Sequence, residues 1–373
     1  MKLTSKYILI VALLMALFSC ESGQENLGVG GNDTTIEIPE YGYIYFDGAA
    51  ASRGVLYETT ADDKRLKANF GVIGYTHTYD DWEDAKVQSK PNVFYNQEVV
   101  WDGSVHSYYK KGNETTNGLE QWIGKQKYAF FAYYPYVESD NMSSSNIKLS
   151  GDGYEGDPYI DFTFSRNDLA AQVDVMTGWD IDVDYSTPTV AFNMEHRLAA
   201  IDVVANNLYI NVEDQSARAD EIEITSITIK LDSLVYDNVR IPLNTRDIAG
   251  LDYTKYGEAT NKTATYELGT NMYNKTIKDV VNTQVTGSAY TSSMIVIPQS
   301  QVLRGNINVG YITKRDGTTI GTVNAKDYPF SFNREIVAGY RYYIQINFAP
   351  GNVTIAVLES DMWEEENINH DFE

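Results

Sequence analysis

The sequence predicts an all-β protein made of antiparallel β-sandwiches, and three observations support this prediction. Many short segments alternate apolar and polar residues with a period of two, as half-buried strands do. Turn-rich stretches separate these segments, and no helical period is sustained between them, which favours sandwiches over an α/β fold. The chain has 373 residues, of which 43% are hydrophobic, and this length suits about two domains.

The amino terminus has the features of a bacterial lipoprotein signal. Met1–Lys6 carries two lysines, and Tyr7–Phe18 is an apolar run of twelve residues. This run is too short to span a ~30 Å hydrocarbon core, but it is normal for the apolar region of a signal peptide. It leads into Leu17-Phe18-Ser19-Cys20, which resembles a lipobox and contains the single cysteine of the chain. We therefore expect residues 1–19 to be a lipoprotein signal peptide and Cys20 to be lipidated, with an ordinary secretory signal as the alternative.

A tether and a first domain are expected to follow. Residues 20–38 are Gly-rich and polar, which is typical of a flexible tether. The N-terminal β-sandwich is expected over residues 39–187, and the least periodic stretch in mid-chain, Asp180–Pro188, marks its end. Strand candidates in this domain are Tyr41–Phe46, Ala68–Tyr75, Lys127–Tyr134 and Tyr159–Phe164, and a short helix is suggested at Asn167–Val173.

The C-terminal β-sandwich is expected over residues 188–373. Within Ile222–Leu231 the apolar phase slips by one residue near Thr225-Ser226, which predicts a β-bulge. Other strand candidates are Val190–Met194, Ala200–Val204, Ser292–Pro298 and Asn306–Thr313, and parts of 270–282 suggest a short helix.

The end of the chain predicts a β-hairpin. In Tyr340–Phe348 every second residue is apolar, which is the pattern of a half-buried strand. Val353, Ile355 and Val357 alternate in the same way after the turn sequence Pro350-Gly351-Asn352.

Charge and cysteine content exclude several classes of function. The chain has 29 Lys and Arg against 52 Asp and Glu, a formal net charge of −23. This argues against nucleic acid and anionic membrane surfaces as partners, because both reward clusters of Lys and Arg. A single cysteine rules out a disulfide framework and a Cys-built zinc site, and four histidines leave little room for a His-built metal site. We expect no metal and no cofactor.

Candidate catalytic and metal-binding residues are few. His77–Asp84 holds four carboxylates and a histidine, but it lacks EF-hand spacing, so a solvated acidic loop is favoured over a calcium or substrate site. Asp180, Asp182 and Asp184 alternate, which fits a solvent-facing sheet edge at least as well as paired catalytic carboxylates. His196 adjoins two strands and is favoured as a packing residue. The nucleophile-elbow, P-loop, zinc-protease and dinucleotide motifs are missing, so we predict that the protein is not an enzyme.

Tyrosine is unusually abundant, with 29 residues. Because Tyr and Trp stack on sugar rings, Trp82, Trp101 and Trp122 with their Tyr neighbours are candidates for a glycan-binding platform. Tyr is also a good strand former that buries a large area while its hydroxyl finds a partner. Most of the tyrosines lie inside alternating segments, which favours the structural interpretation.

A series of segments along the chain gives a more specific indication. They are Phe70–Tyr75, Asn92–Gln97, Trp122, Lys127–Pro135, Asp174–Gly178, Val190–Leu198, Ile295–Gln299, Ala338–Ile344 and Val353–Trp363. Their order and spacing resemble the fimbrillin family of Bacteroidales, the type V pilin subunits and their relatives. The resemblance covers most of the chain after the signal peptide. It implies two transthyretin-like β-sandwiches in tandem and a lipoprotein precursor exposed on the cell outer membrane.

The resemblance also implies a mode of assembly. An arginine- or lysine-specific surface protease removes the lipid anchor together with the first strand, here Tyr41–Phe46. The groove that this leaves is then filled by a strand from another subunit. The loop Ala50–Gly54 contains Arg53 as the expected cleavage site, with Lys64 and Arg65 as substitutes, and an uncut Arg53 is the alternative.

The same resemblance implies that the donor strand lies at the C-terminus. We expect it within Asn352–Trp363, with Val353, Ile355, Val357 and Trp363 as its apolar residues, and its exact span beside the acidic tail Glu364–Glu373 stays open.

These expectations lead to a non-enzymatic, lipid-anchored fimbrial subunit that supports adhesion as part of a homo- or heteropolymer. Two other classes of function stay open on the sequence alone. A surface glycan-binding lipoprotein shares the lipobox, the sandwiches and the aromatic content, and a glycosidase built on a sandwich is the weaker alternative.

Overall fold

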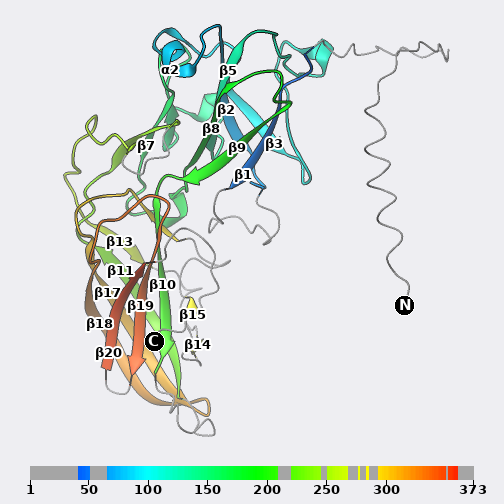
Figure 1. Ribbon diagram of the computed structural model, residues 1–373. Helices are drawn as coiled ribbons and strands as arrows, with labels where there is room; N and C mark the ends of the chain where they lie inside the picture. The colour runs from blue at the N-terminus through cyan, green and yellow to red at the C-terminus, as the bar shows by residue number, and fades with distance from the viewer. Residues whose placement is uncertain are drawn as a thin grey trace, which may run out of the picture. The chain divides into compact units, whose positions relative to one another are not determined.

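The computed structural model describes residues 41–50, 65–208, 220–244, 250–267, 276–277, 283–284, 293–349 and 352–359 (Figure 1). In these residues the chain is mainly β, so the predicted all-β class is confirmed. Its strands form four sheets. The helical elements among the described residues are one short α-helix, α2 (Trp82–Ala85), and the single-turn 3-10 helices η2 (Lys86–Gln88), η3 (Glu114–Thr116), η4 (Ser139–Asn141) and η5 (Leu169–Ala171).

The largest sheet has seven strands in the order β1-β9-β8-β5-β2-β3-β4. Its strands are β1 (Tyr45–Ala50), β2 (Phe70–His77), β3 (Phe94–Trp101), β4 (His106–Tyr108), β5 (Lys127–Tyr134), β8 (Met176–Val183) and β9 (Thr189–His196). All neighbours pair antiparallel except β1, which runs parallel to β9. One face of this sheet buries an aromatic core that includes Phe46, Phe70, Phe94, Phe130 and Phe192.

Two further sheets enclose a second core. One contains β15 (Thr283–Gln284), β10 (Ala199–Asn207), β19 (Arg341–Ala349) and β20 (Asn352–Glu359) in that order, with β16 (Met294–Val296) also pairing with β10. The other contains β13 (Ala264–Glu267), β11 (Glu221–Leu231), β17 (Arg304–Arg315) and β18 (Thr318–Ser331), with β14 (Thr276–Ile277) also pairing with β11. Apolar side chains of both sheets, such as Val203, Ile344, Ile229 and Ile307, pack in one cluster.

A small sheet joins segments from both halves of the sequence. It has the order β12-β7-β6, with β6 (Ile147–Leu149), β7 (Tyr159–Thr163) and β12 (Asn238–Pro242). β7 and β12 pair antiparallel from Asn238↔Thr163 to Pro242↔Tyr159. This pairing crosses the expected domain boundary between residues 187 and 188, and β9 belongs to the seven-stranded sheet. The boundary itself stays a prediction.

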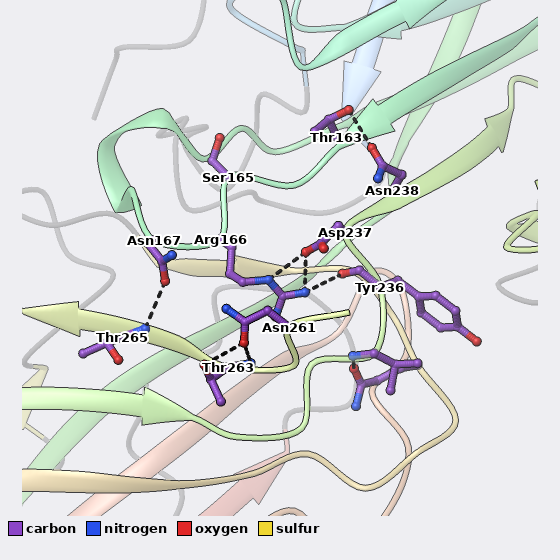
Figure 2. A network of polar contacts seen from close by, with 12 residues as sticks. Thr163, Ser165, Arg166, Asn167, Tyr236, Asp237, Asn238, Asn261, Thr263 and Thr265 are labelled. Carbon is purple, nitrogen blue, oxygen red and sulfur yellow. Dashed lines mark hydrogen bonds and ion pairs between the residues drawn. The ribbon is translucent and has the colours of Figure 1, made fainter. Parts of the chain in front are cut away.

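Polar side chains extend this connection beyond the small sheet (Figure 2). The guanidinium of Arg166 donates to the Asp237 carboxylate, with a distance of 2.7 Å from Nε to Oδ1, and Nη2 reaches the Tyr236 carbonyl. The Thr163 hydroxyl donates to Asn238 Oδ1 at 2.8 Å. Because the Arg166 side chain is only 9% exposed, its charge depends on Asp237 for compensation.

Several predicted elements are confirmed with close bounds. The strand expected at Lys127–Tyr134 is β5 with the same ends. In β11 the pairing with β17 shifts register between Ile224 and Ser226, where the apolar phase slips. The expected hairpin is confirmed by β19 and β20, which pair antiparallel from Tyr342↔Glu359 to Ala349↔Asn352.

Other expectations were wrong in detail. The first strand begins at Tyr45 and not at Tyr41, because Gly42 has a left-handed backbone (φ 76°) and Tyr43 forms an isolated bridge with Gln121. Thr276–Ile277, within the stretch expected to contain a short helix, forms a strand against β11. The parallel pairings β1–β9 and β10–β19 also depart from the purely antiparallel expectation.

A charged pair is buried between the parallel strands β10 and β19. Asp202 is fully buried and Arg341 is 5% exposed, and Nη1 of Arg341 lies 3.4 Å from Oδ2 of Asp202. Burial raises the pKa of Asp202 to about 6, although the Arg341 charge and the nearby Ser293 hydroxyl act in the opposite direction.

We predict that this carboxyl makes the folded protein more stable as pH falls from 7 to 4. An Asp in an unfolded chain titrates near 4, so between about pH 4 and 6 the folded state holds a proton that the unfolded chain has released. The free energy of unfolding should rise by roughly 2 kcal/mol from this group over this pH range, at ~1.4 kcal/mol per pKa unit. Urea unfolding measures the free energy of unfolding of the wild type and of Asp202→Asn between pH 7 and pH 4. This free energy should rise as pH falls in the wild type, and the part of the rise due to Asp202 should be missing in the variant. Equal slopes would contradict the prediction, and the exposed Asp152→Asn is the control.

Candidate functional site

The candidate site is the segment around β1, at one edge of the seven-stranded sheet. β1 pairs with β9 in parallel from Tyr45↔Thr189 to Ala50↔Met194 (Figure 1). On its other side Leu66 N donates to the Gly48 carbonyl at 2.8 Å, and Ala49 forms an isolated bridge with Arg65. Within the described residues β1 therefore pairs along its length with one strand, β9. On its second edge it has backbone contacts with Arg65 and Leu66.

Phe46 and Ile44 anchor this segment in the core. Ile44 is fully buried and Phe46 is 4% exposed. The Phe46 ring contacts four aromatic rings from other strands, with centroid distances of 5.3 to 5.7 Å, namely Phe94, Tyr108, Phe130 and Phe192. Full burial of such a side chain stabilises the folded state by roughly 1.5–3 kcal/mol. Burial of these two side chains therefore supplies a large part of the free energy that keeps this segment on the sheet edge.

Side chains of β4 cover the second edge of this segment. The Tyr108 hydroxyl donates to the Ile44 carbonyl at 2.9 Å, and Ile44 N donates to the Glu120 carbonyl at 2.9 Å. Burial raises the pKa of Tyr108, so its hydroxyl keeps the proton that it donates. The ring of His106 lies 3.0 Å from Asp47 Oδ1 through Nδ1 and 2.7 Å from the Leu66 carbonyl through Nε2.

Sequence reasoning missed this role of β4. His106 and Tyr108 are two residues apart, which puts both on the same face of a strand. That spacing was the available signal, but three residues are too few to stand out as an alternating segment.

The predicted processing residues lie mostly outside the described residues. This is so for Cys20, Arg53 and Lys64. Arg65 is described: it is exposed, its Nη1 donates to the Ser104 carbonyl at 2.8 Å, and its guanidinium lies 5.5 Å from the centre of the Trp101 ring.

Three of the four predicted donor-strand residues lie in β20. Val353 is buried, and Ile355 and Val357 are half-buried against the same core, while Trp363 is outside the described residues. β20 ends its sheet and pairs antiparallel with β19 of its own chain.

The aromatic residues considered for glycan binding do not form an exposed platform. Trp82 is fully buried, with Nε1 donating to Asp157 at 2.8 Å, and Trp122 is 3% exposed. Trp101 is half-buried beside Arg65. The structural interpretation is therefore confirmed for Trp82 and Trp122, whose side chains are buried in the core.

Two of the remaining candidates, His196 and the cluster His77–Asp84, also have structural roles. His196 is buried with Nδ1 2.9 Å from the Asp174 carboxylate, which confirms it as a packing residue. The cluster His77–Asp84 runs into α2 (Trp82–Ala85), whose N-terminus is capped by Asp81, which accepts a hydrogen bond from Asp84 N at 2.9 Å. In the part of the chain that the structure describes, no group of three or more His, Cys, Asp or Glu is placed to hold a metal ion. No helix in that part has the length and apolar character needed to cross a membrane.

Comparison with known proteins gives consistent findings. The family model described as fimbrillin-like matches residues 59–362. Fimbrium subunit Fim1C of Phocaeicola vulgatus is 25% identical over 353 residues, which cover 89% of this chain and 82% of that protein. A crystal structure of a fimbrial protein from Bacteroides vulgatus has a TM-score of 0.61 at 20% identity and covers 86% of this chain and 99% of that one. At this identity the structural likeness bears on the fold alone.

We predict that Phe46→Ala destabilises the protein by about 3–5 kcal/mol, the usual cost of truncating a buried Phe. The expected cause is the cavity left among the four surrounding rings. Tyr45→Ala is the matched control, because the neighbouring Tyr45 is 46% exposed and its loss should cost within about 0.5 kcal/mol. Chemical denaturation measures both changes, and similar losses for the two variants would contradict the anchoring role of Phe46.

Proposed function

Because the chain belongs to the fimbrillin-like family, we propose that it is a structural subunit of a cell-surface fimbria and supports adhesion. The relative that is a fimbrium subunit supports this assignment over most of the length of both chains. We propose a structural and not an enzymatic role, with other fimbrial subunits as partners in a homo- or heteropolymer.

In this proposal the protein reaches the outer membrane as a lipoprotein. Signal peptidase cuts after Ser19, and acyl chains on Cys20 anchor the protein, each buried methylene contributing ~0.8 kcal/mol. A surface protease then cuts after Arg53, which releases the anchor together with residues 20–53. The released part includes β1 with Ile44 and Phe46.

The observation that carries the proposal is the way in which β1 is held. Residues 44–50 lie at a sheet edge, have one ladder partner in β9, and insert two large apolar side chains into the core. Loss of this segment exposes the rings of Phe94, Tyr108, Phe130 and Phe192 and one edge of β9. A strand with apolar residues at alternate positions restores both the burial and the hydrogen bonds, which is β-strand addition.

We propose that the donor strand is supplied by residues Asn352–Trp363 of a subunit. Val353, Ile355 and Val357 alternate in the required way, and in β20 they face the core of their own domain. Donation to another subunit therefore requires β20 to separate from β19. This separation breaks the hydrogen bonds between β19 and β20 and exposes the apolar side chains of β20. It is therefore favourable only when an open acceptor groove can take up the strand.

The test is to compare wild type with Arg53→Ala after surface expression. We expect the mature wild-type chain to begin at Gly54 and to form SDS-resistant ladders, because removal of β1 opens the groove. Arg53→Ala should keep its acylated Cys20 and remain monomeric. N-terminal mass spectrometry and gel electrophoresis measure the two outcomes.

Lys64→Ala serves as the control and should be processed like wild type. Normal ladders from Arg53→Ala would contradict cleavage at Arg53, and ladders from a chain that retains β1 would contradict assembly by strand replacement.

A further inference from the structure

His106 lies where β4 meets the edge of β1. Its side chain is fully buried, whereas the Asp47 side chain is 46% exposed. The imidazole contacts the rings of Phe70 and Trp101, with centroid distances of 5.1 and 4.9 Å. These contacts fix the ring so that one nitrogen faces Leu66 and the other faces β1.

The polar partners of this ring indicate what it recognises. Nε2 lies 2.7 Å from the Leu66 carbonyl, an acceptor, so this nitrogen carries a proton. Nδ1 lies 3.0 Å from Asp47 Oδ1 and 3.4 Å from Gly48 N. When both nitrogens are protonated, Nδ1 donates to the Asp47 carboxylate in the shorter of the two contacts. The neutral ring has only the longer contact, in which the Gly48 amide donates.

The other charged groups near His106 already have partners. The Asp102 carboxylate interacts electrostatically with His106, but it accepts hydrogen bonds from Ser104 N and Val105 N at 2.8 Å each. Arg65 carries a positive charge and faces Trp101. Among the described residues, Asp47 supplies the carboxylate within hydrogen-bonding distance of the ring, and it belongs to the segment that the proposed cleavage removes.

The next residue of β1 sets a second condition, on size. A Cβ at Gly48 would lie 3.0 Å from Cε1 of Phe70, closer than the two atoms pack without movement. A strand that fills the place of β1 therefore needs a small residue at this position. Together with the inward Ile44 and Phe46, the segment shows the pattern apolar, any, apolar, acidic, small over residues 44–48.

The C-terminal segment of this chain meets this pattern poorly. If Val353 and Ile355 take the places of Ile44 and Phe46, Ala356 faces His106 and Val357 takes the place of Gly48. If Ile355 and Val357 take them, Leu358 faces His106 and Glu359 takes the place of Gly48. In both registers that turn the apolar face inward, the residue opposite His106 lacks a carboxylate and the next residue is larger than glycine.

We propose that His106 selects the strand that replaces β1, and that its preferred occupant comes from a different subunit. This occupant carries a carboxylate at the position of Asp47 and a glycine, which places no Cβ against Phe70, at the position of Gly48. The inference rests on the proposed function, because it concerns the groove that removal of β1 opens. It adds that this groove discriminates against the C-terminal strand of a second copy of the same chain.

Peptide binding to the full chain after cleavage at Arg53 and removal of the released fragment tests the proposal. The probes are labelled peptides of residues 41–50, the same peptide with Asp47→Asn, and residues 352–363. We expect the Asp peptide to bind about five-fold more tightly than the Asn peptide, the range of a partly solvated ion pair. Peptide 352–363 should bind roughly tenfold more weakly, since it lacks a hydrogen bond to a charged group.

The chain variant His106→Gln should bind the Asp and Asn peptides equally, which a merely structural role would not produce. Equal binding of the two peptides to the wild-type chain, a measurement that needs no variant, would overturn the proposal. Binding of peptide 352–363 as tightly as the Asp peptide would overturn the preference for a different subunit. Failure of all three peptides to bind would instead contradict the groove itself, and with it the proposed function.

Discussion

Phe46 fills the space between Phe94, Tyr108, Phe130 and Phe192, and this contact joins the first and last strands of the seven-stranded sheet to its centre. A sheet edge leaves backbone donors and acceptors unpaired, and these invite pairing with other chains. Here one edge is completed by a short segment whose hold comes from two apolar side chains, from β9 and from the side chains of β4. In the proposed assembly, the same features allow another strand of similar pattern to take the place of this segment.

The connection between the halves of the sequence follows a different principle. β7 pairs with β12, and the Arg166 charge is compensated by Asp237, so residues from both sides of the expected domain boundary share hydrogen bonds. Removing one partner of such a pair would leave a poorly solvated charge, which costs more than the pair itself contributes. The edge segment and the connection thus differ: the edge segment depends on apolar burial, which many side chains can supply, whereas the charge of Arg166 needs its particular partner Asp237.

The sequence predicted much of the fold because its strands are half-buried and therefore alternate. Lys127–Tyr134 was predicted with its observed ends, and the slip in Ile222–Leu231 located a real bulge. The parallel pairings were not predicted, because alternation says which face is buried and not which neighbour a strand pairs with. The role of His106 was missed for a related reason. Its function depends on Asp47 and Leu66, 59 and 40 residues away in the sequence, and no local pattern records that proximity.

The parallel orientation of β1 and β9 has a consequence for any assembly formed through this edge. Parallel ladders have evenly spaced, slanted hydrogen bonds, so a strand that enters in the opposite direction does not reproduce them. A replacement that restores the ladder must run from the Thr189 end of β9 towards the Met194 end. Each junction would then fix the direction of the next subunit, and a filament built from such junctions would be polar, with two chemically distinct ends.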